Sequence, residues 1–356
     1  MIKDNLQLLN KLAQDSKKID YLYKPGLYWK RIANLACEQM VNYGLKDFRA
    51  FPVDENCFVG RSYTDVETLE PFWLSKKGRL LKKILNNKLF NKYFISQYER
   101  LIKQSYDRGK KYKQVCFSDK FKNLVDDYEK KTPLPVTTIA GCTNTVKIGE
   151  KDYSVKYLMN LSYIEAFKNN GLEFNKINSV MEIGGGFGSF CHLLLSLFPN
   201  IKKYYYIDIC PNIYTGTQYL KIFFDEVYDY NYTSKKNSIT FPNDDNREIY
   251  CIPSWEISKL SSKVDLFWNS HSFVEIDLEQ VLNYYKYIKK LTHVNSILGL
   301  ISYNWHTQEG VGATHDLSKL LNHFDDISFV NCSLESTRWE KDDLGFLGRY
   351  PTAKDQ

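Results

Sequence analysis

Residues 180–188 have the sequence VMEIGGGFG, and this stretch decides the fold. An apolar strand pattern covers residues 179–183, and an apolar helix pattern follows over 190–198 until Pro199. Glycines between the two patterns let the backbone approach a ligand closely, and the start of the helix offers N–H groups that have no partner within the helix. The stretch therefore predicts a strand–turn–helix unit that binds a small molecule.

Strand and helix patterns alternate along the chain after about residue 155. The further strands are predicted at 204–209, 248–252, 264–268 and 296–303, and the further helices at 157–170, 214–224, 278–291 and 317–324. Such alternation is typical of a parallel sheet covered by helices on both faces. The last two strands, 327–332 and 344–350, are separated only by a polar loop, so we expect them to form an antiparallel hairpin. The sequence thus predicts an α/β, Rossmann-like, mostly parallel seven-stranded sheet.

The first 155 residues lack this alternation. Helix patterns cover 6–18, 28–43 and 79–107, and the segment 137–146 is loop-like. We expect a mainly helical cap over 1–155 that selects the substrate, and a cofactor-binding domain over 156–356 that holds its cofactor without the cap. Aromatic residues of the cap either form its own core or offer a platform for a sugar ring, and an arginine there suits a phosphate or carboxylate. These candidates are Tyr28, Trp29, Phe58, Tyr63 and Trp73, with Arg61.

Composition excludes several classes of protein. The chain has 356 residues, 43% hydrophobic and 25% charged, which suits a folded globular protein and not a disordered one. The net charge, 48 − 42 = +6, is too small to imply nucleic-acid binding. The sequence shows no signal peptide and no apolar run long enough for a membrane span. The eight cysteines have no zinc-site spacing, so we expect reduced thiols in a cytoplasmic protein and no metal.

Two classes of ligand use a glycine turn of this kind. Gly184-x-Gly186-x-x-Ser189 comes close to the GxGxxG pattern of nicotinamide dinucleotide sites. Glu182-x-Gly184-x-Gly186-x-Gly188 matches completely the acid-x-Gly-x-Gly-x-Gly pattern of S-adenosylmethionine enzymes. A carboxylate before the first glycine suits a ligand with an ammonium group and repels a pyrophosphate. The acid therefore favours S-adenosylmethionine.

A second acid supports a nucleoside ligand. Asp208 ends the next predicted strand, 20 residues beyond Gly188 (208 − 188). At that place in dinucleotide-binding folds a carboxylate accepts hydrogen bonds from ribose hydroxyls.

Three stretches together resemble the bacterial sugar O-methyltransferase family: EIGGGFGSF at 182–190, YYYIDI at 204–209 and DLFWNSHSFVEI at 265–276. The resemblance covers about residues 155–310. It implies a class I methyltransferase fold and transfer of a methyl group from S-adenosylmethionine to a sugar hydroxyl, for a surface polysaccharide such as capsule or lipopolysaccharide. The acceptor would be a sugar or a nucleotide-sugar. The chain departs from the family in a shifted proline, Pro211, and in Ile276 where a methionine is usual.

The resemblance also assigns candidate cofactor residues. Those for the methionine end are Glu182, Gly184, Gly185, Gly186 and Gly188; Asp208 would bind the ribose, Ile209 and Ser254 would lie near the adenine, and Asn269 and Ser270 beside the methyl group.

Three residues are catalytic candidates. His271 ends the fourth strand and would act as a general base, or would orient the substrate. Glu275 would orient His271, contact a sugar hydroxyl, or only cap the following helix. His306 follows the fifth strand and is the second candidate for the base.

Other functions remain open at this point. A nicotinamide-dependent sugar oxidoreductase would explain the near GxGxxG, and Tyr285-x-x-x-Lys289 has the spacing of one such group. A methyltransferase of non-sugar small molecules needs the same cofactor motif. A nucleic-acid methyltransferase of the base-flipping kind commonly has a Pro-Pro-aromatic stretch where this chain has residues 269–272, NSHS. A non-catalytic binding module would not need both Glu182 and Asp208. The sequence does not determine the oligomeric state.

Overall fold

The computed structural model describes most of the predicted sheet domain and part of the region before it. The described residues are 2–26, 29–30, 33, 36–37, 40–42, 44–49, 118–142, 144–303, 317–322, 324–332 and 343–349. The predicted helix at 79–107 and the candidates Tyr28, Phe58, Arg61, Tyr63, Trp73 and His306 lie outside them.

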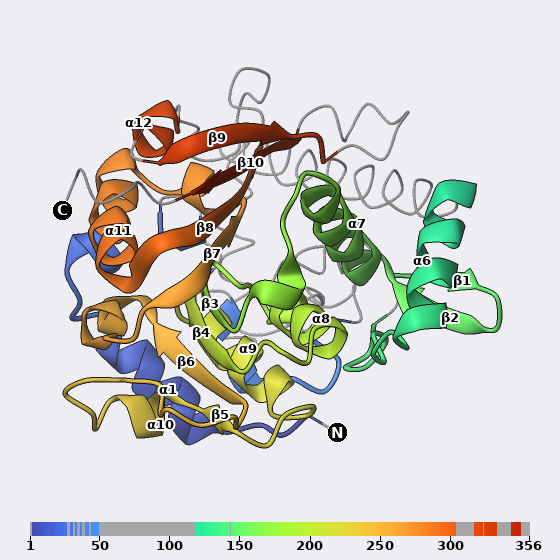
Figure 1. Ribbon diagram of the computed structural model, residues 1–356. Helices are drawn as coiled ribbons and strands as arrows, with labels where there is room; N and C mark the ends of the chain where they lie inside the picture. Colours follow the sequence, from blue (N-terminus) through green and yellow to red (C-terminus); the bar gives the residue numbers. More distant parts are fainter. Residues whose placement is uncertain are drawn as a thin grey trace, which may run out of the picture.

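A mostly parallel sheet forms the centre of the molecule (Figure 1). In spatial order its strands are β5 (Val227–Tyr228), β6 (Glu248–Pro253), β4 (Lys203–Asp208), β3 (Ser179–Ile183), β7 (Val264–Ser270), β8 (Thr292–Tyr303), β10 (Asp343–Arg349) and β9 (Asp325–Val330). Neighbours from β5 to β8 pair in parallel, whereas β10 pairs antiparallel with both β8 and β9. The predicted antiparallel pairing of the last two strands is therefore confirmed. Among the described residues the sheet has eight strands where seven were predicted, because the two-residue β5 extends the edge beyond β6.

Helices cover both faces because successive side chains of each strand point to opposite sides. In β4, Tyr204 and Tyr206 belong to one core cluster, and Tyr205 and Ile207 belong to the other. The first cluster is completed by α7 (Val155–Asn169), α8 (Ser189–Leu197) and α9 (Asn212–Leu220), and the second by α11 (Leu278–Leu291) and α12 (Ser318–Leu321). This is the doubly wound arrangement that the alternation predicted.

The order of the strands fixes where a ligand can bind. Strand β3 lies between β4 and β7, so the chain runs outward from β3 first toward one edge and then toward the other. The carboxyl ends of the parallel strands β3, β4, β6 and β7 meet at one edge of the sheet. Open α/β sheets bind ligands in the crevice at this switch point.

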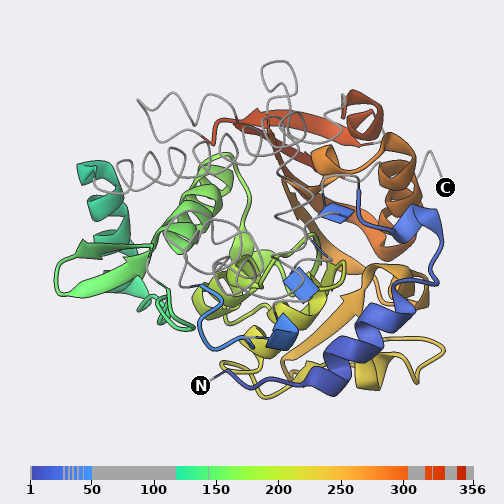
Figure 2. The ribbon, with the colours of Figure 1, turned by 180° about the vertical axis from the view of Figure 1, so that it is seen from behind.

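The start of the chain packs against the sheet domain. Helix α1 (Leu6–Asp15) buries Leu8, Leu9 and Leu12 in the same cluster as α9, and the peptide N–H of Asn5 donates to the Tyr214 hydroxyl at 2.8 Å. Figure 2, which views the molecule from behind, shows this segment in blue beside the short α10 (Tyr230–Thr233). The predicted boundary at residue 155 thus does not separate α1 from the core.

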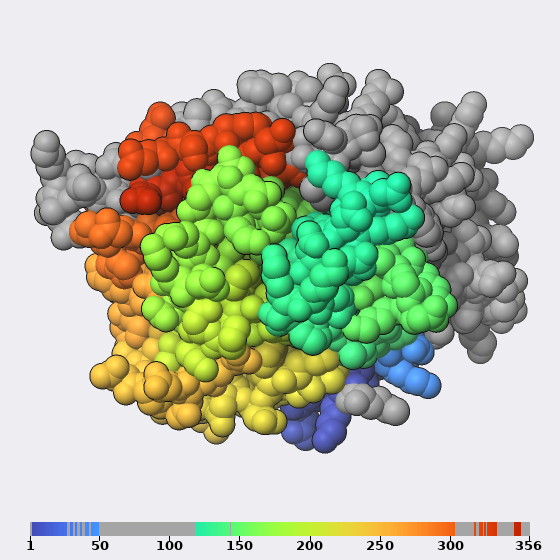
Figure 3. All heavy atoms as spheres, turned by 45° about the vertical axis from the view of Figure 1, so that its right-hand side comes forward, coloured from blue at the N-terminus to red at the C-terminus, as the bar shows by residue number. Residues whose placement is uncertain are grey.

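The described residues just before α7 form a small unit of their own. It consists of α6 (Asp119–Lys131) and the antiparallel pair β1 (Thr145–Ile148) and β2 (Lys151–Ser154). The Tyr128 hydroxyl donates to Glu165 of α7 at 2.8 Å, and Figure 3 shows the unit seated against that helix. The sequence analysis predicted a mainly helical region with a loop-like segment at 137–146, and it predicted neither α6 nor the β1–β2 pair.

Candidate functional site

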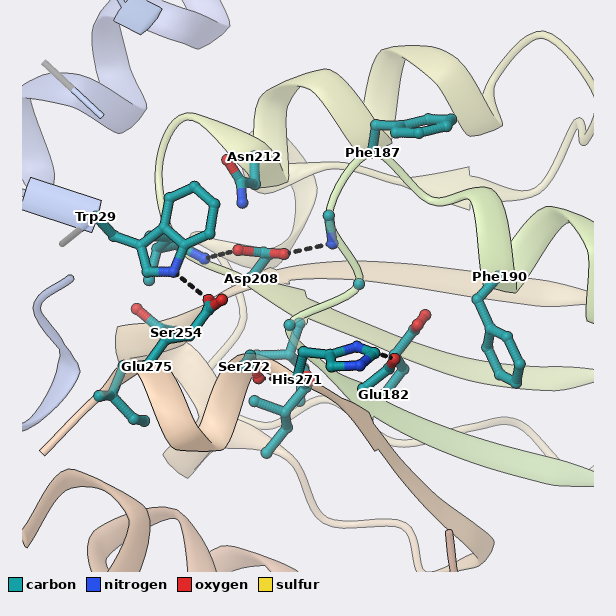
Figure 4. A pocket seen from close by; sticks show the side chains of 18 of the residues that line it. Trp29, Glu182, Phe187, Phe190, Asp208, Asn212, Ser254, His271, Ser272 and Glu275 are labelled. Carbon is teal, nitrogen blue, oxygen red and sulfur yellow. Dashed lines mark hydrogen bonds between the residues drawn. The ribbon is translucent and has the colours of Figure 1, made fainter. Parts of the chain in front are cut away.

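A pocket opens at the carboxyl edge, between the turn after β3 and the ends of β4, β6 and β7 (Figure 4). Of the sequence candidates, the structure brings together around it Trp29, Glu182, Gly184, Gly185, Gly186, Asp208, Ile209, Ser254, Ser270, His271 and Glu275. Gly188 and Asn269 are not among the lining residues. The separate stretches of the motif thus converge on one cavity.

The glycine turn is required by close packing on one side and by the pocket on the other. Gly184 has φ +81°, and a Cβ there would lie 2.2 Å from the Ser272 hydroxyl oxygen, so no side chain fits. Gly186 has φ +63°, and a Cβ added there would meet no neighbouring atom within 4 Å. Gly185 is pressed against the ring of Tyr206, and Gly188 is the N-cap residue of α8. The turn therefore leaves a cradle beside Gly186 that a ligand can fill.

Glu182 is a buried acid within this cradle. Its side chain is 3% exposed, and Oε2 accepts a hydrogen bond from the Tyr204 hydroxyl at 2.9 Å. Burial raises the pKa of Glu182 to about 8, although the bond from Tyr204 and the charge of Lys156 act in the opposite direction. A cationic group in the pocket would favour the ionised form of this carboxyl.

Asp208 lies at the end of β4, across the turn from Glu182. Its carboxylate accepts from the peptide N–H of Gly186 at 2.7 Å and of Ile209 at 2.6 Å. Burial raises the pKa of Asp208 to about 7, and the hydrogen bonds from these two peptide N–H groups oppose the rise. The carboxylate therefore connects the glycine turn to the end of the next strand, where a ribose would lie.

The end of β7 holds a network around Asn269. Its amide nitrogen donates to the carbonyl oxygen of Ile183 at 2.8 Å and to the Ser272 hydroxyl at 2.5 Å, and its amide oxygen accepts from the peptide N–H of Phe273. The side chain is fully buried. Asn269 thus joins the ends of β3 and β7, behind the pocket wall and not within it.

His271 has an unusual backbone conformation. Its φ is +67°, in the left-handed region that non-glycine residues seldom adopt, and its peptide N–H donates to the Ile301 carbonyl oxygen at 2.7 Å. Ring atom Nδ1 lies 2.9 Å from the Ser270 hydroxyl oxygen. Strained positions of this kind cluster at functional sites, which agrees with the prediction that His271 has a functional role.

Glu275 contacts the N-terminal part of the chain. Its Oε2 accepts a hydrogen bond from the indole Nε1–H of Trp29 at 2.6 Å, and the residue is only 7% exposed. In the view of Figure 4 this pair lies with Ser254 on one side of the pocket, while His271 lies on the Glu182 side. The structure therefore supplies a partner for Glu275 that the sequence analysis did not consider.

Several lining residues were missed. They are Lys24, Pro25, Lys156, Asn160, Phe187, Ser189, Phe190, Asn212, Ser272 and Tyr284. Lys156 and Asn160 stand four residues apart on α7, a spacing that places both on one face of a helix. That spacing was visible in the sequence, but nothing in it showed that this face meets the glycine turn.

The described residues lack two structural features. They contain no cluster of three or more His, Cys, Asp or Glu side chains that could hold a metal ion. Within the same residues, no helix combines the length and the apolar character needed to cross a membrane.

Comparisons with known proteins give a limited likeness. No protein-family model and no curated protein matches the chain. Solved structures with some likeness include mitomycin 7-O-methyltransferase MmcR (15% identity, 55% of this chain and 57% of that chain, TM-score 0.35). They also include human N-acetylserotonin methyltransferase in complex with SAM (13%, 54% and 52%, 0.36) and a SAM-dependent methyltransferase from Aquifex aeolicus (16%, 53% and 89%, 0.36). The match spans about half the length of the first two proteins. Likeness at this level transfers neither a substrate nor a reaction.

Proposed function

We propose that the protein is an S-adenosylmethionine-dependent O-methyltransferase that methylates a sugar hydroxyl, for a bacterial surface polysaccharide such as capsule or lipopolysaccharide. The sugar acceptor rests on the resemblance of the three stretches at 182–190, 204–209 and 265–276. The cofactor rests on the pocket itself, which combines the glycine cradle with two buried acids.

The observation that carries the choice of cofactor is the position of Glu182. A buried carboxyl lines the same cradle that a pyrophosphate would occupy in a nicotinamide site, and the ionised form of this carboxyl would repel that group. An ammonium group placed there instead gains a charge-assisted hydrogen bond. Asp208, which accepts from the peptide N–H of Gly186, is the proposed acceptor for the ribose hydroxyls. The donor set therefore fits a nucleoside joined to an amino acid.

When it is bound, S-adenosylmethionine supplies an activated methyl group, and this leaves positioning as the main task of the protein. Glu182 and the turn hold the amino-acid end, and Asp208 holds the ribose. Asn269 fixes the end of β7 against β3, which sets the place of His271 relative to the cradle. The acceptor hydroxyl then has to lie between His271 and the methyl group.

His271 is the proposed general base. A sugar hydroxyl is a poor nucleophile at neutral pH, and a positioned base contributes about 10²–10⁴-fold. When Nδ1–H donates to the Ser270 hydroxyl, Nε2 carries the lone pair that can accept the acceptor's proton. The Ser270 hydroxyl can accept from Nδ1–H, so its contact with His271 is compatible with the tautomer that the proposed reaction needs.

The test is to incubate the purified protein with S-adenosylmethionine and a panel of sugars and nucleotide-sugars, and to search by mass spectrometry for products 14 Da heavier. Matched calorimetric titrations with S-adenosylmethionine and NADH separate the two cofactor classes. Binding of NADH without binding of S-adenosylmethionine would overturn the proposal. A methylated product from a non-sugar acceptor alone would keep the cofactor and reject the acceptor.

A further inference from the structure

The N-terminal part of the chain forms one wall of the pocket. We use the name N-terminal strap for residues 20–26, which include the short 3₁₀ helix η1 (Tyr21–Tyr23). Lys24 and Pro25 of the strap line the same pocket as Glu182 and Asp208, and so does Trp29 just beyond it. The sequence had predicted a cofactor domain that is complete from residue 156.

Several hydrogen bonds attach the strap to α11. The Gln280 amide nitrogen donates to the carbonyl oxygens of Tyr21 and Lys24, both at 2.8 Å. The Tyr23 hydroxyl lies 2.5 Å from that of Tyr287, and Gln280 is buried. Figure 2 shows the strap beside α11 at the back of the molecule. The strap therefore has one defined path across the domain.

The strap also touches the ends of β6 and β7. The Ser254 hydroxyl, which follows β6, donates to the Tyr23 carbonyl oxygen at 2.9 Å. A Cβ on Gly26 would lie 2.5 Å from the Glu275 carbonyl oxygen, so the two backbones meet as closely as a glycine allows. Three residues farther on, the indole of Trp29 donates to the Glu275 carboxylate. These contacts enclose the Ser254 side of the pocket.

That side is suited to a flat apolar base. Pro25, Ile209 and Ile276 supply apolar surface, and Tyr284 adds an aromatic ring. In Figure 4 Trp29 stands next to Asp208, the proposed ribose ligand. An aromatic face that covers this end removes apolar area of the nucleoside from water.

We propose that the N-terminal strap and Trp29 form the wall of the cofactor site that contacts the nucleoside, and that the Trp29–Glu275 hydrogen bond holds Trp29 in this wall. The inference rests on the proposed cofactor and adds the recognition of its nucleoside half. Glu275 is then a positioning residue that holds Trp29, and the sheet domain alone is an incomplete cofactor site.

The test uses the full chain and two probes, S-adenosylhomocysteine and adenosine, in calorimetric titrations. Trp29→Ala should raise the Kd of both probes by the same factor, roughly thirtyfold, because it removes a large aromatic surface from the nucleoside end. Trp29→Phe keeps a ring but loses the N–H that Glu275 accepts, and should raise both Kd values about threefold. Glu182→Gln should weaken the homocysteine-bearing probe and leave adenosine unchanged, because Glu182 faces the other end.

Trp255→Phe is the matched control, because Trp255 packs edge-on against Tyr230, 5.8 Å between ring centres, and does not line the pocket. Its Kd values should equal those of the unchanged protein. Equal binding by Trp29→Ala, or weaker binding of S-adenosylhomocysteine without weaker binding of adenosine, would overturn the inference. If the unchanged protein binds neither probe, the proposed function fails first. Trp29→Phe decides the matter if Trp29→Ala does not fold.

Discussion

The two ends that we propose for the pocket, one for the amino acid of the cofactor and one for its nucleoside, are built in different ways. At the amino-acid end, Glu182 and the glycine turn come from one stretch of nine residues, 180–188. At the nucleoside end, the strap meets Ser254 and Glu275, and the Trp29–Glu275 bond joins residues 246 positions apart. Local chemistry fixes the first end, whereas only the tertiary fold creates the second. The sequence therefore suggests a cofactor from the first end alone. It does not show that residues before the predicted domain boundary at 155 line the second end.

The largest effect is expected at the local end. Gly184→Ala combines a left-handed φ with a Cβ that would lie 2.2 Å from Ser272, so it should abolish detectable binding of S-adenosylhomocysteine and lower the melting temperature. Gly149→Ala is the matched control, because its φ is also positive, +59°, and no atom lies within 4 Å of the added Cβ. This control should cost about 1 kcal/mol of stability and leave binding intact. Equal loss in both variants would show that backbone strain, and not the close packing at the turn, explains the effect.

His271→Ala separates catalysis from binding. We expect kcat to fall about 10²-fold while the Kd for S-adenosylhomocysteine stays within about twofold. His293→Ala serves as the control, since His293 lies half-exposed at the start of β8 and contacts Asp265. The measurement is steady-state kinetics with S-adenosylmethionine and the acceptor that the protein methylates. If turnover by His271→Ala is normal, the base is another residue, and His306 is the next to replace.

The two buried acids predict a dependence on pH. Their pKa values in the folded protein, about 8 for Glu182 and about 7 for Asp208, lie above the ordinary values of 4.5 and 3.8. The folded protein then binds more protons than the unfolded chain between about pH 4 and 8, so stability without cofactor falls as pH rises through this window.

The same shift should act on cofactor binding. A cationic ligand prefers the ionised acids, so binding releases protons and the affinity for S-adenosylmethionine should rise between pH 6 and 7.5, by at most about tenfold per pH unit for each acid. Calorimetry in two buffers with different ionisation enthalpies counts the protons. Glu182→Gln should remove part of the release. A flat affinity over this range would contradict the prediction.

The sequence predicted the sheet well because buried strands have strong patterns. Strand β3 and helix α11 lie where the apolar periodicity placed them, whereas β5 is too short, at two residues, to give a pattern. Pocket residues within the motif were predicted because each lies at or just after the carboxyl end of a strand of the parallel sheet. Trp29 was predicted either as part of the core of the cap or as a sugar platform, and Lys24 and Pro25 were missed. Their placement depends on contacts such as that of Gln280 with the strap, for which no local pattern exists.

The long sequence separation of the strap from its partners has a consequence during synthesis. Residues 20–29 are made before the rest of the sheet domain, and Gln280, the partner of Tyr21, lies 259 positions later. At a synthesis rate of about 5–20 residues per second, roughly 13–50 s pass between the synthesis of the strap and that of Gln280 in α11. Until α9 (Asn212–Leu220) has been made, Leu8, Leu9 and Leu12 of α1 also lack the helix that helps to bury them in the finished protein. The N-terminal strap is thus made long before its partner in α11, and a ribosome stalled before α11 would hold a sheet that still lacks β8, β9 and β10, beside a proposed nucleoside wall that is not yet held in place.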